Sequence, residues 1–295
     1  MKRRQTIRRL EIIAIVAVVA ISLGVGFYLA LSTASNSASV GNPVPQKVYD
    51  ALYQTSVASY GGSGSAYLTD VHTLPSTLQP FSTSGRPTIV YVGAEYCMYC
   101  AVQRWSLIMA LMRFGNFTGL EYMFSSVSDG NYATFTLVNS TYHSNYITFQ
   151  PYEVYDRAGN ALTTLPTNYT SSFKQYGSSS FPFINFNDEY YLSGSILSPP
   201  ILGTMNQTQI ISSIQAGGSL GSQMKEAANL ITAVICKTTG GSPASVCNQS
   251  SISTVTSLVS YSPPSASSSS ELLPAGISFA VSSGTFFKRD YSGWN

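Results

Sequence analysis

The longest apolar stretch lies near the amino terminus, where the twenty residues 12–31 contain no charged side chain. At about 1.5 Å of rise per residue, a helix of this length matches the roughly 30 Å hydrocarbon core of a bilayer. Five basic residues precede it: Lys2, Arg3, Arg4, Arg8 and Arg9. The positive-inside rule then keeps residues 1–11 in the cytoplasm and places the rest of the chain outside the cell. A cleaved signal peptide is the alternative, but its apolar region usually has only about 7 to 15 residues.

Two polar segments bound the part of the chain that can form a folded domain. Residues 32–66 are rich in Ser, Asn, Pro and Gly, with one short apolar stretch near Val48 to Leu52, and predict a stalk with at most a helical turn. We therefore expect the domain to begin close to Tyr67. Residues 261–270 include the run SPPSASSSS, which cannot build a core and predicts a second linker. The domain is therefore expected over 67–260, and residues 271–295 are too short to fold alone and have no assigned role.

The first clear element of this domain is the run PTIVYVG at residues 87–93. Its β-branched and aromatic residues, bounded by Pro and Gly, predict a buried strand. Apolar side chains then recur at helical spacing: Ala101, Trp105, Ile108 and Met112. They predict a helix that ends at Gly115.

The middle of the chain predicts further strands and a helix. The segment 125–175 is too long for a single crossover connection, and its runs 134–138 and 146–149 predict an added hairpin. Residues 162–176 predict a helix. Residues 180–194 then predict two strands joined by a turn at Asn187 and Asp188.

Charge is scarce throughout the chain. Only 9% of the residues are charged, against roughly 25% in typical soluble domains. From Ile12 onward 10 basic residues face 12 acidic ones, because five of the 15 basic residues and one of the 13 acidic residues lie before it. No basic stripe remains for a nucleic-acid backbone, so nucleic-acid binding is excluded.

The chain has four cysteines, and two of them form a Cys-x-x-Cys pair at Cys97 and Cys100. The pair lies where the predicted strand leads into the first turn of the predicted helix. Free backbone N–H groups and the helix dipole stabilise an anion there, which favours a thiolate at Cys97. A thiolate attacks disulfides, and a thiol three residues later can resolve the mixed disulfide.

Two other roles for this pair compete with redox chemistry. Structural zinc needs four ligands, usually as two closely spaced pairs, but Cys236 and Cys247 are separated by ten residues, so we predict no metal site. An inert disulfide between Cys97 and Cys100 would constrain only one helical turn. Cys236 and Cys247 fit a structural disulfide better, because they close a loop between two helical patterns and would contribute about 3 kcal/mol.

A buried strand, a Cys-x-x-Cys pair at the following helix start and later strands are typical of a thioredoxin-like fold. Such a fold has a proline at the entry of a later strand, and Pro182 occupies that place. We expect a cis peptide bond there, which lets a substrate strand pair beside the cysteines. A trans proline at a strand edge is the alternative.

The motifs at 92–115 and 231–247, with the surroundings of Pro182, resemble a membrane-anchored thioredoxin-like family of archaea and actinobacteria, catalogued as domain of unknown function 929. The resemblance covers about residues 67–260. It implies an α/β fold with a central mixed sheet flanked by helices, an inserted segment and a helical carboxyl-terminal part, preceded by one transmembrane helix. It supplies no established substrate.

This chain departs from related proteins at positions near the cysteines. Met98 stands where members of the family often have proline. In the wider thioredoxin superfamily a buried acid commonly lies six residues before the first cysteine, and that position is Tyr91 here. Glu95 is the nearest carboxylate, and two residues before Cys97 it is expected to be a solvated loop residue.

Asn-x-Ser/Thr sequons follow the membrane segment and are candidate glycosylation sites: Asn116, Asn139, Asn168, Asn206 and Asn248. Each alone is a weak pattern in a chain rich in Ser and Thr. Together with the predicted topology they fit an external glycoprotein.

The sequence therefore predicts a membrane-tethered thiol-disulfide oxidoreductase that acts on external proteins and needs no cofactor. Cys97 is the expected nucleophile, Cys100 the resolving thiol, and Pro182 the backbone support for a bound substrate. A membrane quinone-linked oxidant or a thiol-carrying membrane reductase could recycle the pair. The alternative is a redox-inert cell-surface glycoprotein that uses the fold for binding or structure.

Overall fold

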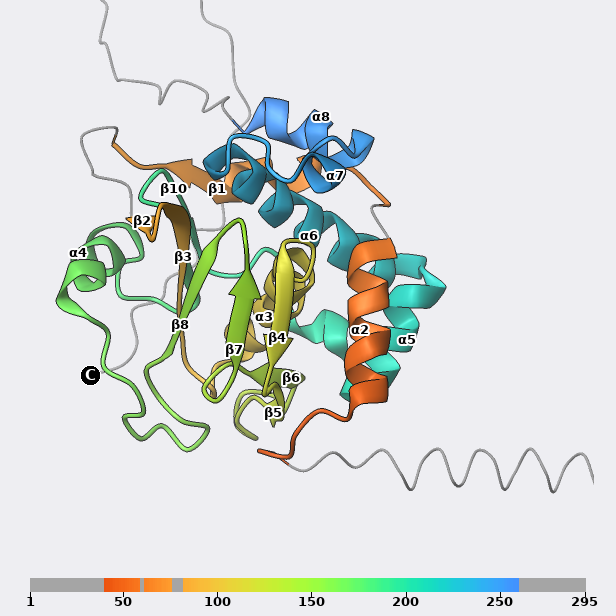
Figure 1. Ribbon diagram of the computed structural model, residues 1–295. Helices are drawn as coiled ribbons and strands as arrows, with labels where there is room; N and C mark the ends of the chain where they lie inside the picture. Colours follow the sequence, from red (N-terminus) through yellow and green to blue (C-terminus); the bar gives the residue numbers. More distant parts are fainter. Residues whose placement is uncertain (1–39, 59–60, 76–81, 260–295) are drawn as a thin grey trace, which may run out of the picture. The chain divides into compact units, whose positions relative to one another are not determined.

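The computed structural model describes residues 40–58, 61–75 and 82–259 (Figure 1). The chain divides into two compact units after Ser262, and all of these residues belong to the first unit. Within them, no helix combines the length and the apolar character that crossing a bilayer requires. The predicted transmembrane helix at 12–31 lies outside the described residues, as do the cytoplasmic segment, the second linker and the carboxyl-terminal segment.

The centre of the described unit is a six-stranded mixed sheet (Figure 1). Its main strands follow the spatial order β1 (Val71–Thr73), β10 (Tyr190–Ser193), β9 (Phe183–Phe186), β3 (Arg86–Gly93) and β8 (Thr148–Glu153). The short β2 (Ser82–Thr83) pairs antiparallel with the start of β3. β8 runs parallel to β3, and β9 runs antiparallel to it on the other side. β3 is therefore the central strand, and its continuous apolar run reflects burial on both faces.

Helices lie on both faces of this sheet, and Figure 1 shows α4 on one side with α3 and α6 on the other. The helical elements are α2 (Gln46–Ala58), η1 (Ser65–Asp70), α3 (Met98–Leu111), α4 (Thr167–Tyr176), η2 (Pro199–Leu202), α5 (Gln207–Ala216), α6 (Gly218–Thr238), α7 (Ala244–Cys247) and α8 (Ser250–Leu258). Ile89 and Tyr91 of β3 point into the larger hydrophobic cluster, which includes the buried apolar side chains of the later turns of α3 and of α6. Val90 and Val92 point into a smaller cluster with α4. The alternation of side chains along one strand thus assigns a different helical layer to each face.

Several predicted elements are present. The predicted strand 87–93 is β3, and the strands predicted at 180–194 are β9 and β10. Asn187 and Asp188 form the turn between them with φ values of 59° and 55°. Such left-handed conformations are required at both central positions of the hairpin turn that suits twisted strands, and Asn and Asp tolerate them.

The predicted stalk at 32–66 is wrong for its described part. Residues 46–58 form α2, which packs against α3 and α5, and Leu52 is fully buried in the main core. Leu52, Thr55 and Ser56 lie on one helical face, so the short apolar stretch suffices to dock a helix that is otherwise polar. The folded part therefore begins well before Tyr67.

The predicted hairpin between 134–138 and 146–149 is also wrong. The inserted segment forms two separate pairs: β5 (Glu121–Phe124) with β6 (Ala133–Thr136), and β4 (Gly115–Thr118) with β7 (Thr141–Ser144). Thr148 and Phe149 belong instead to the central strand β8. Short β-rich runs do not encode their partners, because strand pairing depends on packing against distant elements.

Two predicted helix ends also differ from the structure. α3 ends at Leu111, and Gly115 begins β4, where a Cβ atom would lie 2.1 Å from the backbone oxygen of His143. Gly115 is therefore required by close strand approach and not by a helix end. α4 begins at Thr167, after the N-cap Pro166, because the residue before a proline avoids helical conformation.

Candidate redox site

The pair Cys97 and Cys100 lies at the amino-terminal end of α3, with Cys97 four residues after the last residue of β3. Cys97 is the N-cap of the helix, with extended φ and ψ values of −72° and 124°. The backbone N–H of Cys100 donates a hydrogen bond to the Cys97 sulfur at 3.2 Å. The sulfur therefore occupies the place of a capping oxygen and receives one of the N–H groups that a helix start leaves free.

The two thiols are both free but differ in access to solvent. Cys97 is 7% exposed, whereas Cys100 is fully buried. A hydrogen bond from the Cys100 thiol lowers the pKa of Cys97 against the effect of burial, and the N–H groups of Cys100 and Tyr99 and the charge of Arg104 assist. Burial raises the pKa of Cys100 well above its usual value, and its bond to Cys97 adds to this. The Cys97 sulfur is thus the less buried of the two and has the lowered pKa, whereas the Cys100 sulfur is fully enclosed and has the raised pKa.

Pro182 lies at the entry of β9, and the peptide bond between Phe181 and Pro182 is cis. Phe181 packs against the cluster of Ala94, Cys97 and Cys100, so the fold brings this segment to the cysteines. The Pro182 carbonyl accepts a hydrogen bond from the Gly194 N–H at 2.8 Å, which ties the start of β9 to the end of β10.

Aromatic side chains surround Cys97. Tyr96, Tyr99 and Phe181 pack against the cysteine cluster. The ring of Tyr155 lies 6.1 Å from that of Tyr96 and 6.1 Å from that of Phe181. Tyr155 is among the exposed large apolar residues. The side chains packed around Cys97 are therefore largely aromatic.

Glu95 is not the solvated loop residue that its position predicted. It is only 7% exposed, and the hydroxyl of Thr136 donates a hydrogen bond of 2.6 Å to its Oε1. Burial raises the pKa of Glu95, against the lowering effect of this hydrogen bond. Thr136 comes from β6 of the inserted segment, so the burial of Glu95 depends on a pairing that the sequence did not predict.

A buried ion pair between Arg104 and Glu153 lies close to the cysteines and was not found from the sequence. Arg104 is fully buried on α3, and Glu153 is 1% exposed at the end of β8. The guanidinium donates from Nε to Oε1 and from Nη2 to Oε2, both at 2.7 Å, and Nη2 also donates to the Ala94 carbonyl at 2.8 Å. The available signal was spacing, since Arg104 follows Cys100 by one turn and precedes the buried Ile108 by another.

Tyr91, six residues before Cys97, is fully buried beside this ion pair. The Arg104 guanidinium carbon lies 6.0 Å from the centre of the Tyr91 ring. Burial raises the pKa of Tyr91 well above its usual value. Gly93 makes room for this side chain, because a Cβ atom there would lie 2.1 Å from the Tyr91 hydroxyl oxygen.

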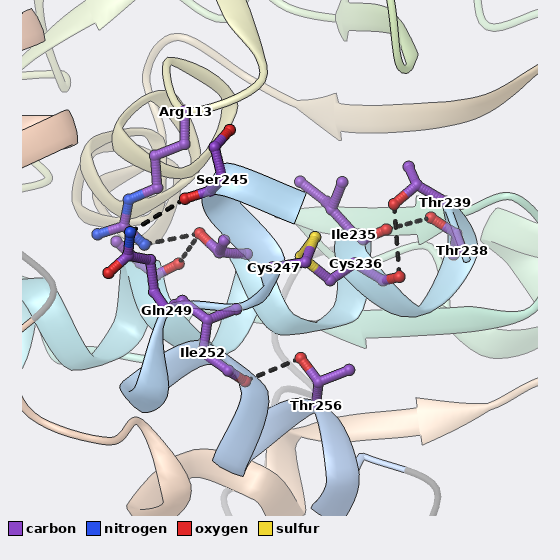
Figure 2. The surroundings of a disulfide bond; sticks show 12 residues. Arg113, Ile235, Cys236, Thr238, Thr239, Ser245, Cys247, Gln249, Ile252 and Thr256 are labelled. Atoms are coloured by element: carbon purple, nitrogen blue, oxygen red, sulfur yellow. Dashed lines mark hydrogen bonds between the residues drawn. A yellow bond between two sulfur atoms is a disulfide. The ribbon is translucent and has the colours of Figure 1, made fainter. Parts of the chain in front are cut away.

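Cys236 and Cys247 form a disulfide that joins the last turns of α6 to α7 (Figure 2). Figure 2 shows the bond among the helix ends around Ile235, Thr239 and Ile252. Both sulfurs that could complete a zinc site with Cys97 and Cys100 are therefore already used. Among residues 40–58, 61–75 and 82–259, no group of three or more His, Cys, Asp and Glu side chains is placed to hold a metal ion.

The sequons differ in their surroundings. The exposed ones are Asn116, Asn139, Asn168 and Asn248. Asn206 is half-buried, and its side-chain oxygen caps α5 by accepting the N–H of Gln209 at 2.9 Å.

The fold and the site define a mixed α/β domain with a half-hidden dithiol pair at a helix start. A family model described as "Domain of unknown function (DUF929)" matches residues 75–237, and the chain belongs to this family. The match confirms the family expected from the two cysteine motifs. No curated protein and no solved structure matches the chain significantly.

Proposed function

We propose that the domain has a thioredoxin-like fold and acts as a thiol-disulfide oxidoreductase on proteins outside the membrane. The fold assignment is supported by the path from β3 into the Cys-x-x-Cys helix, through the parallel β8 and α4, to β9. β9 enters through a cis proline and pairs with β3. These are the parts that the proposed fold requires around its active cysteines.

The observation that carries the functional proposal is the unequal state of the two thiols. Cys97 is slightly exposed, at 7%, and has a lowered pKa, whereas Cys100 is fully buried and has a raised pKa. In the reducing direction the Cys97 thiolate attacks a substrate disulfide and forms a mixed disulfide, which releases one substrate thiolate. Cys100 then attacks the Cys97 sulfur, the second substrate sulfur leaves with the bonding electron pair, and the pair ends oxidised. In the oxidising direction the same steps run in reverse.

The substrates we propose are extracytoplasmic proteins, with the enzyme held at the membrane by residues 12–31. The aromatic surface of Tyr96, Tyr155 and Phe181 supports contact with apolar segments around a substrate cysteine. A membrane-bound oxidant or reductant would return the pair to its starting state.

The proposal is tested by trapping with the full-length chain. A Cys100→Ser variant should accumulate mixed disulfides through Cys97, because the resolving thiol is missing. A Cys97→Ser variant is the matched control and should accumulate none, since Cys100 is buried. If the Cys100→Ser variant traps nothing while Cys97 and Cys100 are unreactive in the folded wild type, the redox proposal fails and the inert alternative replaces it.

The reduction potential of the pair separates the two functions independently. A value between about −270 and −120 mV supports exchange with protein substrates. A value far below about −300 mV would instead identify a permanent disulfide in a binding or structural module.

A further inference from the structure

The described part of the chain contains four buried side-chain nitrogen or oxygen atoms without a hydrogen-bond partner. Two of them, the Arg104 Nη1 and the Tyr91 hydroxyl, belong to side chains that interact electrostatically with Cys100. A buried donor without a partner costs about 1–3 kcal/mol, and more if it is charged. Such a donor requires an explanation, and beside a reactive group a role in the reaction is one.

The ion pair with Glu153 uses only one side of the guanidinium. Nε and both hydrogens of Nη2 are engaged by Glu153 and the Ala94 carbonyl, which leaves both hydrogens of Nη1 free. Arg104 follows Cys100 by four residues on α3, so the two side chains project from the same helix face. Glu153 therefore holds the guanidinium in a fixed orientation while a donor pair stays available.

We propose that Arg104 is the counter-charge for the Cys100 thiolate and that Glu153 positions it; this inference rests on the proposed exchange function. When the Cys97 mixed disulfide is resolved, Cys100 loses its proton to solvent and its sulfur attacks the Cys97 sulfur. The bond between Cys97 and the substrate sulfur breaks, and the substrate sulfur leaves with the electron pair and takes up a proton. In the opposite direction Cys100 is the leaving thiolate, and the same charge stabilises it.

The titratable and charged groups near Cys100 come from α3, from strands β3 and β8, and from the loop before the cysteine pair. They are Cys97 and Arg104 on and before α3, Tyr91 on β3, Glu153 on β8, and Glu95 and Tyr96 in the loop before the pair. Arg104 is the one cation in this set and favours the thiolate, whereas Glu153 opposes it. Removing Glu153 alone and removing both charges should therefore shift the Cys100 reaction in opposite directions.

The two steps can be followed separately in one experiment on the reduced full-length chain in detergent. Mixing with excess dithiobis(nitrobenzoate) releases one coloured thiolate when Cys97 attacks and a second when Cys100 resolves the adduct. In Arg104→Met/Glu153→Leu the second release should be about tenfold slower at pH 7, with its pH profile displaced upward. In Glu153→Gln the second release should be faster, with its profile displaced downward.

Arg113 provides a matched control just beyond the end of the same helix. It is also buried, and it donates to the Ser56 carbonyl, Asn229 and Thr232. Arg113→Lys should leave both releases and their pH profiles unchanged. The role of Arg104 is established if the second release becomes faster in Glu153→Gln and slower in Arg104→Met/Glu153→Leu. A general loosening of the fold would not shift the two variants in opposite directions.

An unchanged or slower second release in folded Glu153→Gln would overturn the inference, even if the double variant does not fold. So would an unchanged pH profile in a folded double variant. Failure of the exchange function itself is a separate result: the reduction potential of the wild-type pair would then lie far below about −300 mV, whatever the rate of the second release.

Discussion

Removing one partner of the buried ion pair should lower the free energy of unfolding far more than removing both partners. Arg104 and Glu153 are 0% and 1% exposed and are joined by two hydrogen bonds of 2.7 Å. Arg104→Met leaves a carboxylate in the core, and Glu153→Leu leaves a guanidinium there. Each single change should lower the free energy of unfolding by about 3–5 kcal/mol.

The double variant Arg104→Met/Glu153→Leu removes both charges and fills similar volumes with apolar groups. Its remaining loss is the hydrogen bond to the Ala94 carbonyl, which leaves an unpaired acceptor and costs about 1–3 kcal/mol. The two single losses should therefore exceed the double loss by several kcal/mol, a large coupling for a contacting pair.

The assay is urea unfolding of the four proteins of this cycle, as full-length chains in one detergent, followed by circular dichroism. Equal slopes against urea would show that the unfolded states are comparable. Single losses below about 1 kcal/mol, or a double loss equal to their sum, would refute the assignment of a tightly coupled buried pair.

Three further changes test other parts of the structure. Replacing Cys236 and Cys247 by alanine opens a loop with a sequence separation of 11 and should cost about 3 kcal/mol of unfolding free energy in urea; equal stability would be contrary evidence. Because burial raises the pKa of Glu95, its contribution to stability is full below its unfolded pKa and is lost as pH rises through the folded pKa. Glu95→Gln, which can still accept from Thr136, should therefore gain stability over wild type at pH 7 but not at pH 3; a pH-independent difference would contradict this. Tyr91→Phe removes a buried hydroxyl without a partner, so thermal unfolding should show equal or greater stability, and a clear loss would reveal a bond that the hydroxyl makes.

The parts of the fold that could be predicted are those encoded by local patterns. The apolar run of β3, the helical spacing after it and the pair Asn187 and Asp188 each specify a conformation within a few residues. Cys97 and Cys100 were located for the same reason, since their chemistry follows from lying at a helix start.

The parts that were missed depend on distant partners. The mostly polar sequence of α2 does not indicate that Leu52 enters the core. The sequence of the inserted segment likewise does not indicate that β6 pairs with β5 and β7 with β4. Glu95 is buried only because β6 covers it, and Glu153 meets Arg104 only through the parallel register of β3 and β8. A charged residue in a sequence does not indicate its own burial, because burial is set by what folds against it.

The burial of Cys100 also links the redox chemistry to the folding equilibrium. Forming or breaking a disulfide at a thiol that is part of the core changes the packing of the core and therefore the free energy of unfolding. By a thermodynamic cycle, the stability difference between the oxidised and reduced domains equals the difference in reduction potential between the folded and unfolded pair, at about 30 mV for each 1.4 kcal/mol. A substitution far from α3 that favours one of the two packed forms should therefore shift the reduction potential of the cysteine pair without touching either sulfur.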